Sequence, residues 1–90
     1  MPYFVLNLDK ALALSNKRRE AVGLPKIKGA HELATMLNEI DADAYEVKNT
    51  YQQIRMASTR GVRSMPEHTI ANIIDILIVT RAELVKYDLK

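Results

Sequence analysis

The sequence contains no cysteine, which excludes disulfide bonds, cysteine zinc ligands and a thiolate nucleophile. This composition fits a reducing compartment, and we expect a cytoplasmic protein. Only three glycines are present and none is near another, so a glycine-rich phosphate-binding loop is excluded. The most apolar stretch, residues 70–79, contains Asn72 and Asp75 and is too short to span a bilayer, so no membrane partner is expected.

The sequence also lacks the signals of a secreted protein or an enzyme. No secretory leader is expected, because residues 1–8 have no basic segment and no cleavage site. Residues 31–35 begin like the zinc-protease helix motif, but Thr35 stands where that motif needs a second histidine. The remaining histidine, His68, has no partners that suggest catalysis. We predict no metal, no cofactor, no small-molecule substrate and no enzymatic activity.

Charge is distributed unevenly, although the net charge is only +2. One short segment holds four acids: Glu39, Asp41, Asp43 and Glu46. Residues 50–66 then contain three arginines, two adjacent glutamines and no acid. Arginine and glutamine are side chains that contact phosphates and base edges, so this stretch is the first candidate for a binding surface.

A chain of 90 residues is the size of one domain, and its few glycines and prolines separate segments with helical periodicity. We predict one helix that begins at Asp9 and stops before Gly23, and another over residues 30–40 after Gly29. Residues 3–8 fit either an added helical turn or a short strand. Apolar residues at alternating spacings of four and three predict one long helix over residues 41–58. A break at residues 49–50 is the alternative, because Asn and Thr favour caps.

Two capping patterns predict the remaining helices. Ser64 and Glu67 flank Pro66 in the first pattern, and Thr80 and Glu83 form the second, which starts a short helix reaching Tyr87. The predicted fold class is all-α, a compact bundle of about five helices in a single domain over residues 1–90. We expect six apolar side chains to be buried together: Leu33, Leu37, Ile54, Ile70, Ile73 and Leu77.

Two segments resemble a known family. Residues 31–38, His-Glu-Leu-Ala-Thr-Met-Leu-Asn, are similar to the first motif helix of the lambda-repressor-like (Xre/Cro-type) helix-turn-helix proteins. Residues 69–85 resemble the last two helices of that family, and the resemblance extends over residues 9–87 in helix order. It implies a helix-turn-helix and DNA binding. The chain departs from the family in about ten extra residues after Leu37, which either lengthen the recognition helix or insert an acidic turn, and in Ala30, where the family has a phosphate-binding glutamine.

The resemblance also implies a DNA-binding surface. It places Thr50 at the cap of the recognition helix, with Tyr51, Gln52 and Gln53 at its first positions. Glutamine can form a bidentate pair with adenine, and arginine can contact phosphate or guanine. The predicted DNA-binding residues are Lys28, Thr50, Tyr51, Gln52, Gln53, Arg55, Arg60 and Arg63.

The predicted function is sequence-specific binding of double-stranded DNA by a small repressor-like transcriptional regulator of phage, plasmid or bacterial type. The alternative is a protein-interaction module on the same fold, such as an antirepressor, antitoxin or inhibitor, because the acids of residues 39–46 would repel phosphates. The position of those acids relative to Gln52, Gln53 and Arg55 separates the two hypotheses. We also expect a symmetric homodimer that uses the apolar residues 3–6 or 84–89.

Overall fold

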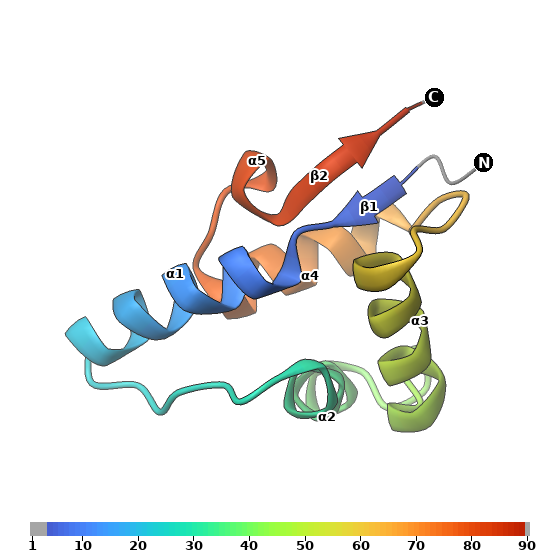
Figure 1. Ribbon diagram of the computed structural model, residues 1–90. Helices are drawn as coiled ribbons and strands as arrows, with labels where there is room; N and C mark the ends of the chain where they lie inside the picture. The colour runs from blue at the N-terminus through green and yellow to red at the C-terminus, as the bar shows by residue number, and fades with distance from the viewer. Residues whose placement is uncertain (1–3, 90) are drawn as a thin grey trace.

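The structure is a computed structural model that describes residues 4–89. It contains five helices and two strands (Figure 1), in the order β1 (Phe4–Leu6), α1 (Leu8–Ala21), α2 (Ala30–Ile40), α3 (Val47–Thr59), α4 (Glu67–Leu77), α5 (Arg81–Leu84) and β2 (Val85–Asp88). The chain is thus mostly helical, as predicted, with a small sheet that an all-α fold does not include. No helix within the described residues has the length and apolar character needed to cross a membrane.

The sheet joins the two ends of the described chain. β1 and β2 are antiparallel, with Phe4 opposite Asp88 and Val5 opposite Tyr87. On the other side of β1, Phe4 exchanges two backbone hydrogen bonds of 2.8 Å with Val62. Of the two interpretations of residues 3–8, the short strand is therefore confirmed for residues 4–6, and residue 3 lies outside the described range.

The predicted fifth helix is too long. It ends at Leu84, and the chain then extends as β2 instead of continuing to Tyr87. Its start is confirmed, because the Glu83 N–H donates to Thr80 Oγ1 and the Thr80 N–H donates to Glu83 Oε1. A strand partner is available in β1, and the β-branched and aromatic residues of β2 suit a pleated surface, so pairing prevails over local helical periodicity.

The third helix begins six residues later than predicted, at Val47. Asp41 Oδ1 accepts hydrogen bonds from the N–H groups of Asp43 and Ala44, both 3.1 Å long, and this closes a turn. Aspartate commonly competes with helix formation in this way. Tyr45 is buried after the turn, where its carbonyl accepts a hydrogen bond from Asn38 Nδ2. The alternative break at residues 49–50 is also wrong, because both residues lie inside α3.

The start of the fourth helix differs as well. Pro66 occupies the N-cap position and α4 begins at Glu67, so the predicted capping role of Ser64 is wrong. The residue before a proline is disfavoured in the helical region, which favours a helix start after residue 65. At the end of α1, Gly23 has a φ of +77°, which fits the predicted stop.

The predicted core is confirmed. All six of its apolar side chains, from α2, α3 and α4, are buried in one cluster. Phe4 and Leu6 from β1 and Leu84 from α5 complete this cluster. α2 packs most extensively on α3, so the core fixes the position of α3.

An ion pair fastens α1 to α5. Arg18 Nη1 and Nη2 each donate a hydrogen bond to a different Glu83 carboxylate oxygen, and both donor–acceptor distances are 2.8 Å. Arg18 Nη1 also donates to the carbonyl of Ile78, whose φ of +56° ends α4 in a left-handed conformation. The pKa of the Glu83 carboxyl is lowered to about 2. The hydrogen bonds from Arg18 are the largest cause, and the hydrogen bond from the Thr80 backbone N–H is the next largest.

We expect the stability contributed by Glu83 to disappear in acid. A folded-state pKa below the ordinary carboxyl value means that the contribution is complete above about pH 4.5 and is lost as the pH falls toward about 2. Thermal unfolding of the parent and of Glu83→Gln should therefore differ at neutral pH and converge near pH 2. Glu39→Gln, at an exposed position near the end of α2, controls for the charge change. A difference between parent and Glu83→Gln that is constant with pH would contradict the prediction.

Candidate nucleic-acid interface

α3 has a buried face and an exposed face. Thr50, Ile54 and Ala57 are buried, which is the pattern of a helix that packs along one stripe. An exposed stripe with the same spacing includes Lys48, Gln52, Arg55, Met56 and Thr59, and Asn49 beside Lys48 is exposed as well. It extends about 16 Å along the helix axis at 1.5 Å per residue.

The exposed face of α3 and the loop after it carry uncompensated positive charge. Residues 47–66 contain four basic side chains and no acid: Lys48, Arg55, Arg60 and Arg63. Across residues 4–89, ion pairs involve Arg18, Lys26 and Arg81, and none involves these four. The four cations are all exposed and are thus available to an anionic partner.

Three of the predicted binding residues lie together in one shallow hollow. The hollow has a volume of about 450 Å³ and is lined by Gln52, Arg55, Met56, Thr59 and Arg60. Met56 is half-exposed at 50%. The surface therefore combines an amide, two guanidinium groups and an apolar side chain along about two turns of α3 and the residue after it.

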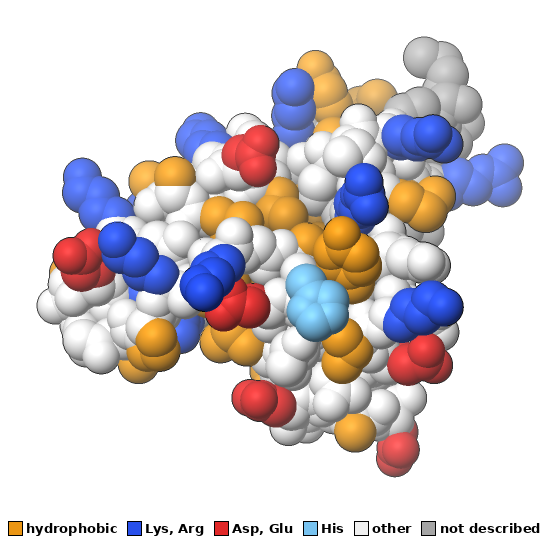
Figure 2. Space-filling model, turned by 60° about the horizontal axis from the view of Figure 1, so that its bottom comes forward, with side chains coloured by type: hydrophobic (Ala, Val, Ile, Leu, Met, Phe, Trp, Pro, Cys, Tyr) orange, Lys and Arg blue, Asp and Glu red, His pale blue; other side chains and the backbone are white. Residues whose placement is uncertain are grey.

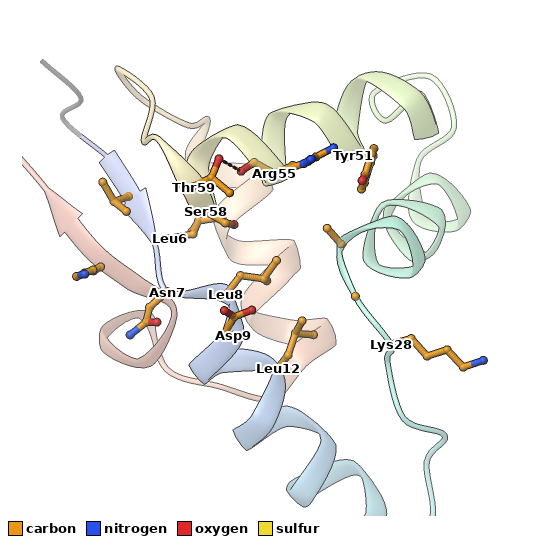
Figure 3. Close-up of a pocket in the computed structure, with 14 residues that line it drawn as sticks. Leu6, Asn7, Leu8, Asp9, Leu12, Lys28, Tyr51, Arg55, Ser58 and Thr59 are labelled. Atoms are coloured by element: carbon orange, nitrogen blue, oxygen red, sulfur yellow. Dashed lines mark hydrogen bonds between the residues drawn. The ribbon is translucent and has the colours of Figure 1, made fainter.

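A second cleft adjoins this hollow through Arg55 (Figure 3). It has a volume of about 460 Å³ and lies between the start of α1, residues 28–30 and α3. Lys28, Tyr51 and Arg55 from the predicted set line it, together with Asp9 and Lys86. Figure 3 shows the Arg55 side chain running along α3 toward Tyr51, with Lys28 on the segment across the gap.

Tyr51 is only partly available in this cleft. It is half-buried and packs edge-on against His31, with 5.6 Å between the ring centroids. Its hydroxyl group can still present a hydrogen bond to a ligand, because the side chain lines the cleft. Figure 2 shows one face of the molecule, where basic side chains lie mostly in the upper part and acids are scattered among them and over the lower part.

Three predicted residues are placed differently from the expectation. Thr50 is 4% exposed and lies inside the first turn of α3, so its predicted role as the helix cap is wrong. Gln53 is half-buried and lines neither hollow. Arg63 is exposed but lines a separate hollow of about 360 Å³ with Phe4 and Leu89. Because α3 begins at Val47, before the predicted cap position, Thr50 lies in the buried stripe of α3, one helical turn before Ile54.

Sequence reasoning missed four residues of this surface. Lys48, Met56 and Thr59 lie at helical spacings from Gln52 and Arg55, and this periodicity could have identified them. Lys86 could not have been found in the same way, because its segment was predicted as a helix and is a strand.

Three of the four acids precede α3, in the turn and at its N-cap, and the fourth, Glu39, lies on α2 beside a hollow that Lys26 and Thr35 also line. Glu39 is near the end of α2, Asp41 and Asp43 are in the turn, and Glu46 is the N-cap residue of α3. All are exposed, and α3 itself contains no acid. Arg55 is eight residues after Val47, about 12 Å further along the helix axis. Asp41, Asp43 and Glu46 therefore lie at the N-terminal end of the cationic stripe, where Glu46 accepts a hydrogen bond from Asn49 Nδ2 in the first turn of α3.

Comparison of the chain with protein-family models, with curated proteins and with solved structures gives no match.

Proposed function

We propose that the protein binds double-stranded DNA through the exposed face of α3 and acts as a small transcriptional regulator of the repressor type. The observation that supports this most directly is the stripe of α3, where cations without acidic partners flank Gln52 and Met56. In this proposal α2, the turn at residues 41–46 and α3 serve as a helix-turn-helix, with α3 as the recognition helix.

The chemistry of the stripe suits the major groove. That groove is wide enough to admit an α-helix, and the amide of Gln52 matches the N6 and N7 pattern of adenine. Met56 offers an apolar contact to a thymine methyl group. Arg55 and Arg60 line the same hollow as these two residues, Lys28 lines the adjoining cleft, and all three can neutralise backbone phosphates.

The acids of residues 39–46 favour a second candidate, a protein-interaction module. Recognition helices usually contact bases with their N-terminal residues, and the acids lie beside that end of α3. They would repel phosphates there. DNA binding therefore requires that the middle and C-terminal half of α3 make the contacts, whereas a protein partner with both charge signs could cover the whole face.

Selection of duplexes from a random pool tests the proposal. We expect enrichment of a defined sequence, and affinity that falls with salt at a slope of about −0.9 for each phosphate neutralised. Binding should be measured by fluorescence anisotropy for the enriched duplex and a shuffled duplex between about 50 and 200 mM salt. Failure to enrich any sequence, together with affinity independent of salt, would favour the protein partner.

A further inference from the structure

The outer edge of β2 is free. Within residues 4–89 the sheet has two strands, and β1 is covered on its other side by Val62. β2 has β1 on one side only. Lys86, Tyr87, Asp88 and Leu89 are all exposed, with 52% of Tyr87 and 60% of Leu89 accessible. Unpaired backbone groups beside exposed apolar side chains form a template for another strand.

Only one of the two surfaces expected to form a dimer remains available. Phe4 and Leu6 are each 2% exposed, because β1 packs into the core of its own chain. The first surface, residues 3–6, is therefore used inside the monomer over the part that the structure describes. The C-terminal segment is the remaining candidate.

We propose that β2 pairs antiparallel with β2 of a second copy, on a two-fold axis through Tyr87. Directly opposite residues in an antiparallel pair must both turn their N–H and C=O groups toward the partner, or both away from it, so the axis passes through a residue. The two-fold axis could pass through any of the three exposed residues of β2, which are Lys86, Tyr87 and Asp88. In each case the same patch of both copies forms the interface.

Charge selects among the three centres. An axis through Lys86 places two lysines directly opposite each other, and an axis through Asp88 does the same with two aspartates. Like charges opposite each other destabilise a strand pair. The axis through Tyr87 instead sets Lys86 opposite Asp88 of the second copy, twice by symmetry, and this self-complementary order is present in Val-Lys-Tyr-Asp-Leu.

The side chains needed for these pairs are available. In the described chain no acid pairs with Lys86, whose ammonium lies 5.7 Å from the centroid of the Tyr87 ring. Asp88 accepts from Arg81 through Oδ2, which leaves Oδ1 for Lys86 of the second copy. The same register brings the two Tyr87 side chains together and sets Leu89 opposite Val85, so the exposed apolar surface of Tyr87 and Leu89 becomes covered.

A competing role for the same residues is to prevent pairing. A lysine and an irregular register are features that keep natural edge strands apart, and β2 has both, with the irregularity opposite Val5 and Leu6. That role predicts a monomer at every concentration. The proposal does not depend on DNA binding, so it can be tested with the protein alone.

The absence of cysteine allows a direct test of the register. In Tyr87→Cys, the two Cα atoms across the axis would lie about 4.5–5.5 Å apart, within reach of a disulfide. We expect mild oxidation to cross-link Tyr87→Cys into a dimer, and to leave Thr59→Cys, at an exposed position on α3, monomeric. Stronger cross-linking of Lys86→Cys or Asp88→Cys than of Tyr87→Cys would overturn the register.

Sedimentation of the unmodified chain tests the dimer itself. We expect a dimer at micromolar concentration, and a rise of about tenfold in its dissociation constant for Lys86→Asp, which turns both cross-strand pairs into repulsive ones. The exchange Lys86→Asp with Asp88→Lys should restore much of the affinity. A monomeric parent chain that also fails to cross-link through Tyr87→Cys would overturn the proposal, whatever its behaviour with DNA.

Discussion

Replacement of Leu37 by alanine should lower the free energy of unfolding by about 2–5 kcal/mol. Leu37 is fully buried on α2 and belongs to the cluster that joins α2 to α3 and α4. Truncation leaves a cavity there, and the helices around it can close it only in part. A domain of this size has a total stability on the order of 5–13 kcal/mol, so the variant should be close to unfolding at 37 °C.

Urea unfolding followed by circular dichroism measures this change. Ile40→Ala is the matched control, because Ile40 is on the same helix but 55% exposed, and its replacement should have a much smaller effect. Equal urea midpoints for Leu37→Ala and the parent would remove Leu37 from the core and with it the packing that positions α3.

The next largest effects are expected on DNA affinity, where two substitutions should distinguish a contact with a base edge from a contact with a phosphate. Gln52→Ala should weaken binding to the selected duplex by roughly 1–3 kcal/mol and to random DNA by much less. Arg60→Ala should weaken binding to both duplexes about equally and should reduce the salt slope by about one unit. The signatures differ because base patterns change with sequence and phosphates do not.

These variants should be titrated against both duplexes at several salt concentrations. Lys17→Ala removes a positive charge from an exposed position on α1 that borders neither hollow, so it controls for net charge alone. Gln53→Ala should have a smaller effect than Gln52→Ala, because Gln53 is half-buried. If Gln52→Ala, Arg55→Ala and Arg60→Ala all bind as the parent does while remaining folded, α3 is not the DNA surface and a protein partner becomes the better hypothesis.

The parts of the fold that depend on local signals were predictable. The periodicity of α2 and α4 identified the core residues Leu33, Leu37, Ile70 and Ile73, and the Thr80 box placed the start of α5. β2 was not predictable, because its partner β1 lies at the opposite end of the described chain, and no local pattern reports such a pairing. The start of α3 was misplaced because Asp41 stabilises a turn where apolar spacing alone indicated a helix.

The residue types of the candidate site could be predicted from the sequence better than the face of the helix on which each residue lies. Gln52, Arg55 and Arg60 were grouped from charge and residue type, which are visible in the sequence, and they line one hollow. Which side chain of a helix faces outward depends on where the helix packs. The packing of α3 against α2 buries Thr50 and leaves Met56 exposed, and only the structure shows this packing.

The pairing of β1 with β2 has a consequence for the newly made chain. Phe4 and Leu6 of β1 leave the ribosome well before the partner strand of β1, which follows only at Val85–Asp88. At a synthesis rate of about 5–20 residues per second, roughly 4–17 s pass between the synthesis of β1 and that of β2. During that interval α2, α3 and α4 can pack in order of synthesis and β1 can pair with Val62, while the edge of β1 that faces β2 stays open to chaperones or to other nascent chains. A translational pause before residue 85 would prolong this exposure without changing the folded protein.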